Sequence, residues 1–195
     1  FKMSEEEWDA AIAVHLKGSF NMTRAAAPYF KEQKSGRFIH FTSTSGLIGN
    51  VGQANYSAAK LGIVGLSKST ALDMARYNVT SNAIAPFAWS RLIGTIPAET
   101  DDEKLRVERL KQLSPAHIAP LVGFLSSDEA ADVSGQIFGV RGKEIMVFSQ
   151  PRPVRSVFNA DGWSVDSLSA IKGSLQSSFT PLEVSADVFP YEPLV

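Results

Sequence analysis

The sequence contains no cysteine. A disulfide framework therefore cannot form, and a metal centre with cysteine ligands is excluded as well. An excess of one charge sign is also missing, because 19 Lys and Arg stand against 20 Asp and Glu, which gives a formal net charge of -1 at pH 7. Proteins that bind nucleic acid or an anionic membrane usually carry a basic surface. We therefore expect a small-molecule partner, and neither nucleic acid nor a membrane.

Long apolar runs are missing too. The sequence has no run of about eighteen apolar residues that could span a bilayer. It does not open with the charged and then apolar segments of a signal peptide. With 195 residues, of which 44% are hydrophobic and 20% are charged, the composition is typical of a single globular domain. These features predict a cytoplasmic protein.

A glycine-rich phosphate-binding turn is the third absence. Doubly wound folds that bind a dinucleotide carry the pattern GxGxxG directly after their first strand, and this pattern does not occur in the sequence. The segment Gly46–Gly52 lies between a predicted strand and a predicted helix, but its spacing is GxxGxxG and a long helix precedes the strand. This segment is therefore not predicted to hold the phosphates of a dinucleotide.

The most informative stretch that is present runs from Phe38 to Lys60. Apolar, β-prone residues at its start predict a strand over 38–42, and alanines at helical spacing predict a helix over about 54–77. Tyr56 and Lys60 are four residues apart on this helix, so their side chains lie on the same face. Ser43 ends the strand thirteen residues before Tyr56. All three side chains can therefore meet where the strand ends and the helix begins.

Such a trio has a definite chemistry. Free tyrosine has a pKa near ~10, and an ammonium ~4 Å away favours the phenolate by roughly 4 kcal/mol at an effective dielectric constant of ~20. This attraction is expected to bring the pKa of Tyr56 towards ~7, where a tyrosine can act as an acid or base. Ser43 can hydrogen-bond the reacting oxygen. The set suits hydride transfer at a carbinol carbon, whereas Tyr56 and Lys60 alone could be an ordinary surface pair.

The order and spacing of these residues resemble the short-chain dehydrogenase/reductase family. The segments around them resemble it too: SG and GNVGQANYSAAKLG in the loop and helix, then VTSNAIAP, LSSDEA and SGQIFGVRG. The resemblance covers roughly residues 3–143 and leaves 144–195 as a C-terminal extension. It implies the C-terminal part of a doubly wound, Rossmann-like α/β fold with a parallel sheet. Three strands would lie in this chain, and four strands with the cofactor's phosphate loop would lie upstream of Phe1.

The resemblance also implies the roles of individual residues. Ser43, Tyr56 and Lys60 take the catalytic positions of the family, and Tyr56 and Lys60 bind the cofactor, the lysine by holding the nicotinamide ribose. The family commonly has Pro-Gly and then a threonine at the nicotinamide. Here Pro86 keeps the proline, Phe87 replaces the glycine, and Ser90 is the nearest hydroxyl. The cofactor is expected to be NAD or NADP, and the choice between them is made after the second strand, in the part expected upstream.

His15 has two interpretations. It lies on or beside the apolar stripe of the first predicted helix, where a core histidine would hydrogen-bond a neighbour. This chain has VHLKGSF where most members of the family it resembles have an asparagine. In those members the asparagine holds a water molecule of a proton relay to the lysine. Histidine followed by LKGSF resembles the dehydrogenase unit of peroxisomal multifunctional β-oxidation enzymes and their bacterial relatives. We expect His15 to act in the relay.

The remaining pattern predicts further elements. A Ser4–Glu7 capping box starts a helix to about Phe30, broken near Pro28 and ended by Ser35-Gly36. The other expectations are a strand over 78–85 closed by Pro86, a helix over 100–113 with a mobile lid at its start, a helix from Ser114-Pro115 to about Leu125, a strand over 136–140, a hairpin over 145–158 and a helix over 164–174. Trp89, Leu92 and Ile93 face the ligand cleft or form a plain hydrophobic loop.

The expected activity follows from the resemblance. A hydride passes between NAD(P) and a secondary alcohol or ketone, with a 3-hydroxyacyl-CoA or related acyl thioester as the leading substrate. Arg152 and Arg155 could meet the phosphates of the coenzyme A, or form a solvated basic turn. The alternatives are a dehydrogenase of steroids or other bulky alcohols, and a catalytically silent oligomerising fragment. Small residues such as Ala58 and Gly62 permit close helix packing, and the family assembles through these helices. A homodimer or homotetramer is expected.

Overall fold

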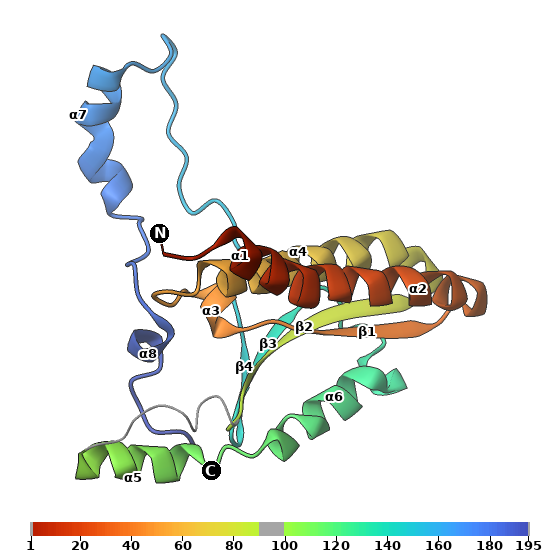
Figure 1. The fold of residues 1–195 in the computed structure, drawn as a ribbon. Helices are drawn as coiled ribbons and strands as arrows, with labels where there is room; N and C mark the ends of the chain where they lie inside the picture. Colours follow the sequence, from red (N-terminus) through yellow and green to blue (C-terminus); the bar gives the residue numbers. More distant parts are fainter. Residues whose placement is uncertain (1, 90–99, 195) are drawn as a thin grey trace.

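The computed structural model describes residues 2–89 and 100–194, whose centre is a four-stranded sheet (Figure 1). The strands follow one another in the order β1 (Gly36–Phe41), β2 (Val79–Phe87), β3 (Ile137–Arg141) and β4 (Glu144–Val147). The first three are parallel, and β4 is antiparallel to β3. The predicted α/β fold with a parallel sheet is therefore confirmed.

The three predicted strands of the parallel sheet are present as β1, β2 and β3. The position of the predicted hairpin was wrong, because the chain already turns back after Arg141 and pairs Glu144 with it. The hairpin consequently spans β3 and β4, and residues 148–158, the greater part of the predicted hairpin over 145–158, have no regular structure.

Strand β2 also continues past its predicted end, because Pro86 and Phe87 still pair with β3. Alternate residues of a strand direct their backbone groups to the same neighbour. Ile84 directs its carbonyl oxygen toward β1, where it accepts a hydrogen bond of 2.8 Å from Thr42. The nitrogen of Pro86 points the same way, and the β1 pairing has ended there. The missing N–H of the proline therefore leaves no ladder bond unmade.

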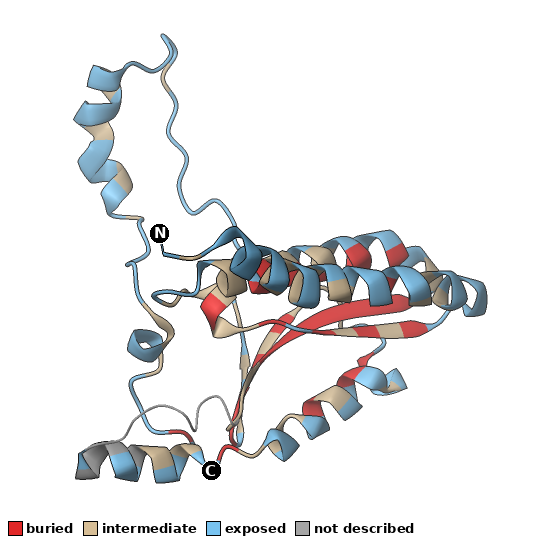
Figure 2. Cartoon of the chain, viewed as in Figure 1, coloured by how far each residue is buried: buried red, intermediate tan, exposed pale blue. Residues whose placement is uncertain are grey.

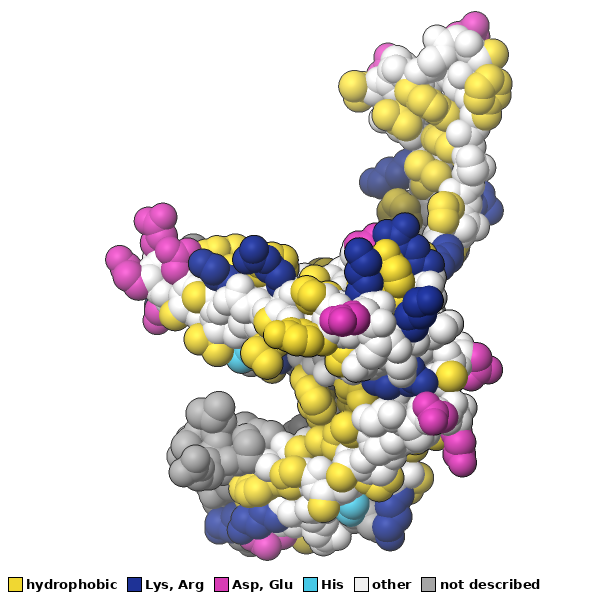
Figure 3. Space-filling model, turned by 90° about the vertical axis from the view of Figure 1, so that its right-hand side faces the viewer, with side chains coloured by type: hydrophobic (Ala, Val, Ile, Leu, Met, Phe, Trp, Pro, Cys, Tyr) yellow, Lys and Arg dark blue, Asp and Glu magenta, His cyan; other side chains and the backbone are white. Residues whose placement is uncertain are grey.

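Helices cover both faces of this sheet. One layer contains α4 (Ala54–Met74) and a long helix made of α1 (Glu5–Ala11), the π-helical segment η1 (Ile12–Lys17) and α2 (Gly18–Gln33). The other layer contains α6 (Ala119–Ser126) (Figure 1). Because β2 lies between both layers, its residues from Val79 to Ala85 are buried (Figure 2). Figure 3 shows an open hollow between the two helical layers, with hydrophobic side chains at its back.

The long first helix does not break near Pro28, contrary to the prediction. Its capping box is present, since Ser4 N–H donates to Glu7 Oε2 at 2.8 Å and Glu7 N–H to Ser4 Oγ at 3.2 Å. The helix ends where Lys34 takes a left-handed conformation with φ of 53°. Around the proline, Ala27 and Phe30 pack on the core cluster of β1 and α4. This packing holds the helix together although one backbone hydrogen bond is lost.

Shorter elements connect the layers. These are α3 (Thr44–Leu47), the 3-10 turns η2 (Ala75–Tyr77), η4 (Pro115–His117) and η5 (Asp128–Ala130), α5 (Asp101–Leu110), α7 (Val165–Gln176) and α8 (Ser185–Val188). The predicted helix after Ser114 is divided into η4 and α6. The helices predicted over 54–77, 100–113 and 164–174 appear as α4 with η2, α5 and α7. The mobile lid expected at the start of the second of these stays a prediction.

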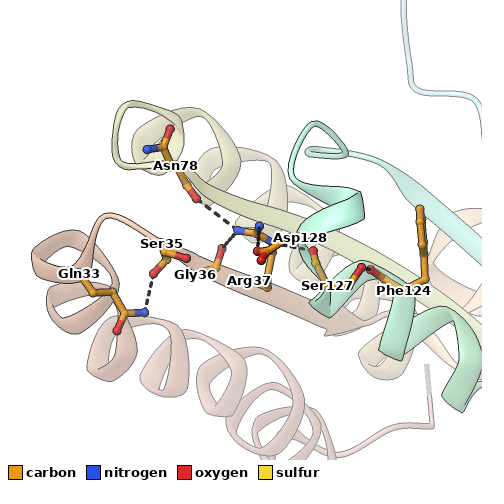
Figure 4. A network of polar contacts seen from close by, with 8 residues as sticks. All are labelled: Gln33, Ser35, Gly36, Arg37, Asn78, Phe124, Ser127 and Asp128. Atoms are coloured by element: carbon orange, nitrogen blue, oxygen red, sulfur yellow. Dashed lines mark hydrogen bonds and ion pairs between the residues drawn. The ribbon is translucent and has the colours of Figure 1, made fainter.

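The amino ends of β1 and β2 are joined by Arg37 (Figure 4). Its guanidinium donates to the carbonyl oxygens of Gly36 at 3.0 Å, Asn78 at 3.3 Å and Ser127 at 3.4 Å, and it lies 3.5 Å from Asp128. Because Asp128 is exposed, the ion pair adds little stability, and the carbonyl contacts carry the junction. This network fixes the sheet at the edge opposite to the carboxyl ends of the strands.

The C-terminal part leaves the sheet after β4 and later returns to it. Its helix α7 stands away from the body of the molecule and is largely exposed (Figures 1 and 2). The chain then comes back, and Ser185 N–H donates to the carbonyl of Gly49 at 3.2 Å while Lys143 N–H donates to that of Leu194 at 2.7 Å. The division between 1–143 and 144–195 stays a prediction. Among the described residues, no helix is long and apolar enough to cross a membrane.

Candidate active site

Helix α4 places Tyr56 and Lys60 together near its start. Lys60 Nζ lies 5.5 Å from the centroid of the Tyr56 ring, and it donates a hydrogen bond of 3.0 Å to the carbonyl oxygen of Phe41 at the end of β1. Lys60 is buried, and this burial lowers the pKa of its ammonium below the ordinary value. A cation is thus held beside the tyrosine, where the parallel strand ends.

The turn that carries Ser43 packs directly on the backbone of α4. Ser43 caps α3 and accepts a hydrogen bond of 3.2 Å from Ser45 N–H, and Thr42 Oγ1 donates to the carbonyl oxygen of Lys60 at 2.7 Å. A Cβ atom added to Gly46 would lie 2.6 Å from the backbone nitrogen of Leu61. Only glycine permits this approach, so the Ser43 turn is held at the segment that carries Lys60.

His15 reaches the same place from the other helix. Its ring is 5.1 Å from the Tyr56 ring, centroid to centroid, with an angle of 83° between the planes. Burial, and then the positive charge of Lys60, lower the pKa of His15 below its ordinary value. The imidazole is therefore neutral at pH 7. Tyr56, Lys60 and His15 form one cluster, which we call the tyrosine cluster.

The sequence did not reveal that His15 lies in a π-helical segment. Segments of this kind are rare and often occur at functional sites. Close packing against α4 accompanies it, because a Cβ atom at Gly62 would lie 2.9 Å from Leu16 Cδ2. One of the small residues predicted to serve packing or an interface therefore serves packing within the chain.

A cavity of about 530 Å³ lies along β1 and α2 beside the tyrosine cluster, and His15, His40 and Lys60 are in its lining. Sequence reasoning missed His40. This histidine is buried, its Nε2 has no hydrogen-bond partner among the described residues, and burial lowers its pKa. The alternation of β1 offered a signal, because it places His40 on the same face as the core residue Phe38.

Comparison with known proteins identifies the family. The family model described as Enoyl-(Acyl carrier protein) reductase matches residues 1–142. The chain belongs to the short-chain dehydrogenase/reductase family.

Its similarity to individual members is also clear. Hydroxyacyl-CoA dehydrogenase ChsB1 of Mycobacterium tuberculosis is 42% identical over 174 residues, covering 85% of this chain and 54% of the relative. Peroxisomal multifunctional enzyme type 2 of Drosophila melanogaster is 39% identical over 199 residues, covering 94% of this chain and 32% of the relative. The crystal structure of a short chain dehydrogenase from Mycobacterium avium has a TM-score of 0.78 at 40% identity, covering 93% of this chain and 61% of that one. The chain therefore spans about half the length of ChsB1 and about a third of the length of the Drosophila enzyme.

Only part of the segment that is expected to contact the nicotinamide lies within the described residues. Pro86 and Phe87 lie at the carboxyl end of β2. The ring of Phe87 meets that of Phe189 from the C-terminal part, with centroids 5.0 Å apart in a T-shaped arrangement. Ser90 lies outside the described residues, as do Leu92 and Ile93. Trp89 donates its backbone N–H to Leu113 at 2.7 Å.

The family's cofactor fits the tyrosine cluster at one end. The Lys60 ammonium has three donors, of which one is used on Phe41, and it borders a cavity that His15 and Ser19 also line. Lys60 and Tyr56 would therefore hold the ribose of a nicotinamide nucleotide, which supplies the hydride acceptor or donor. Arg152 and Arg155 are exposed and bond the carbonyl of Pro151 at 2.8 Å and Ser174 Oγ at 2.6 Å. Their contact with coenzyme A phosphates stays a prediction.

Proposed function

We propose that the protein acts as an NAD(P)-dependent dehydrogenase or reductase of a secondary alcohol or ketone, with a 3-hydroxyacyl-CoA or related acyl thioester as substrate. The observation that carries this proposal is the tyrosine cluster, in which a buried lysine and a neutral histidine flank one tyrosine ring. The acyl thioester is supported by the relatives, two of which are named for hydroxyacyl-CoA dehydrogenation and for a peroxisomal multifunctional enzyme.

Each residue has a separate task in this mechanism. Tyr56 exchanges the proton of the reacting oxygen through its phenol oxygen, as acid in reduction and as base in oxidation. Lys60 places a positive charge beside the tyrosine ring and holds the ribose of the cofactor. Ser43 hydrogen-bonds the reacting oxygen. Substrate is held at the carboxyl ends of β1 and β2, where parallel sheets bind their ligands.

His15 links this centre to water. A neutral imidazole can accept a proton on one nitrogen and donate one from the other. Its position against Tyr56 and under the field of Lys60 supports a role in carrying a proton between the cluster and solvent.

The test is a substrate panel followed by nicotinamide absorbance in the complete protein. We expect turnover of 3-hydroxyacyl-CoA esters with NAD or NADP, and much weaker turnover of steroid alcohols. Turnover of steroids alone would favour the bulky-alcohol alternative. Folded protein that binds neither cofactor nor substrate would favour the catalytically silent module. The expected homodimer or homotetramer and the cytoplasmic location remain predictions, which sedimentation and cell fractionation would test.

A further inference from the structure

Arg141 is a buried arginine at the carboxyl end of β3 and is 7% exposed. Its guanidinium carbon lies 4.8 Å from the centroid of the Tyr191 ring and 5.9 Å from those of Phe87 and Phe189. An arginine keeps its charge in such surroundings, so its burial must be compensated. The three rings compensate it through cation–π contacts.

The polar contacts of Arg141 also lead to the C-terminal residues. Nη2 donates a hydrogen bond to the carbonyl oxygen of Tyr191. Nη1 is 3.7 Å from Glu144 Oε2, and within the described residues neither of these two atoms has a hydrogen-bond partner. The charge of Arg141 is balanced by the Glu144 carboxylate of β4 and by the C-terminal residues Phe189 and Tyr191. The planar guanidinium is suited to the ring contacts where an ammonium is not.

The segment from Glu183 to Leu194, which we call the tail, crosses the carboxyl ends of the strands. It is fixed at one end by the hydrogen bond from Ser185 to Gly49, in the loop that follows Ser43. At the other end Lys143 N–H bonds Leu194, and Glu192 lies 3.2 Å from Arg109 of α5. Figure 1 shows the tail, which includes α8, running down to the C-terminus beside α5.

A cavity of about 440 Å³ lies between the tail and the loop after Ser43. Leu47 of α3, Ile48 and Phe148 line one side of it, and the other side consists of residues 180–182, directly before the tail, with Glu183 and Val188 of the tail itself. These walls are predominantly apolar, and the cavity begins four residues beyond the predicted catalytic serine. It therefore suits the acyl chain of a substrate whose reacting oxygen meets Ser43.

We propose that Arg141 is a positioning residue that holds the tail as a wall of this cavity and so sets the preference for acyl chain length. This proposal rests on the proposed function for the identity of the substrate. Arg141 touches neither the cofactor nor the reacting atoms. It acts through Phe189 and Tyr191, which it fastens over the ends of β2 and β3.

The test compares Arg141→Met, Arg141→Lys and a matched control, Lys172→Met, in the complete protein. Lys172 belongs to the C-terminal part and is exposed. For each variant, kcat and KM are measured with 3-hydroxybutyryl-CoA and 3-hydroxydecanoyl-CoA, together with the KM of the cofactor and Tm. Chymotrypsin cleavage after Tyr191, followed by mass spectrometry, reports whether the tail is still fastened.

Both Arg141 variants are expected to change the ratio of kcat/KM between the two chain lengths by about tenfold, the scale on which pocket contacts discriminate. Cleavage of the tail should be about tenfold faster, because proteolysis follows the population of the released form. The cofactor KM and the Lys172→Met values should stay at the wild-type level. A purely structural role would lower Tm without moving the chain-length ratio.

Faster cleavage with an unchanged ratio would overturn the proposal, and so would unchanged cleavage. If Arg141→Met does not fold, a variant that ends at Val188 must show the same shift in chain-length ratio. If the wild-type protein turns over steroid alcohols and no acyl thioester, the proposed substrate class has failed. The cleavage rates and the KM of the accepted alcohol then decide the positioning role separately.

Discussion

The packing of the Ser43 turn against α4 leads to a sharp prediction for Gly46→Ala. The added Cβ atom would lie 2.6 Å from the backbone nitrogen of Leu61 and 3.0 Å from the carbonyl carbon of Lys60. These are backbone atoms of a helix, so no side-chain rotation can relieve the contact. Either the turn or the helix must move, and the relative position of Ser43 and Lys60 changes with it.

The magnitude follows from two effects. Overpacking of this kind costs about 1–3 kcal/mol of stability, which corresponds to roughly 2–12 °C in Tm for a chain of this size. A displacement of catalytic groups by about 1 Å can lower the rate on the order of 100-fold. We therefore expect Gly46→Ala to lose far more activity than its loss of stability explains.

Gly65→Ala is the matched control. Gly65 lies inside the same helix, and a Cβ atom there would meet nothing within 4 Å. Alanine in a helix interior should raise the stability by about 0.5–1 kcal/mol, with activity unchanged. Urea unfolding and steady-state turnover of both variants are the assays. A Gly46→Ala protein with normal stability and turnover, or a Gly65→Ala protein as damaged as Gly46→Ala, would refute the packing argument.

Other residues of the site give further predictions. His15→Asn should keep most of the activity, whereas His15→Leu should fold normally and lose activity most near neutral pH. The pH–rate profiles of both variants measure this, and a stable, fully active His15→Leu protein would mean that His15 only packs in the core. Burial lowers the pKa of His40, so it favours the folded state above the ordinary pKa of ~6.5 and this contribution is lost as the pH falls. His40→Gln should therefore flatten the loss of unfolding free energy on acidification, and an unchanged slope in urea titrations would contradict this. Burial likewise lowers the pKa of Lys60, which means that its charge is unfavourable in the folded state, so Lys60→Met should keep or raise Tm. The same variant should abolish turnover, because it removes the ammonium beside Tyr56; retained turnover would exclude the catalytic role of Lys60.

Much of the fold was predictable because its signals are local. The capping box at Ser4, the apolar start of β1 and the helical spacing after Ala54 each determine an element from neighbouring residues. The four-residue spacing of Tyr56 and Lys60 placed them on one face in the same way. These signals need no knowledge of distant parts of the chain.

What could not be predicted depends on contacts between distant residues. Strand β4 is short and exists because β3 offers it an edge to pair with. The continuation of β2 through Pro86 depends on where β1 ends. Arg141 looks like an ordinary strand residue in the sequence. The ring and the carbonyl oxygen that its guanidinium contacts belong to Tyr191, which lies fifty residues later in the chain.

The central claim is that Tyr56 exchanges the proton during hydride transfer. It is tested most directly by Tyr56→Phe in the complete protein, with single-turnover nicotinamide absorbance and urea unfolding. The ring contacts with His15 and Lys60 remain in this variant, so stability should barely change. We expect the rate of hydride transfer to fall by at least ~100-fold, the lower range for an acid or base group. A stable Tyr56→Phe protein that transfers hydride at nearly the wild-type rate would contradict the account.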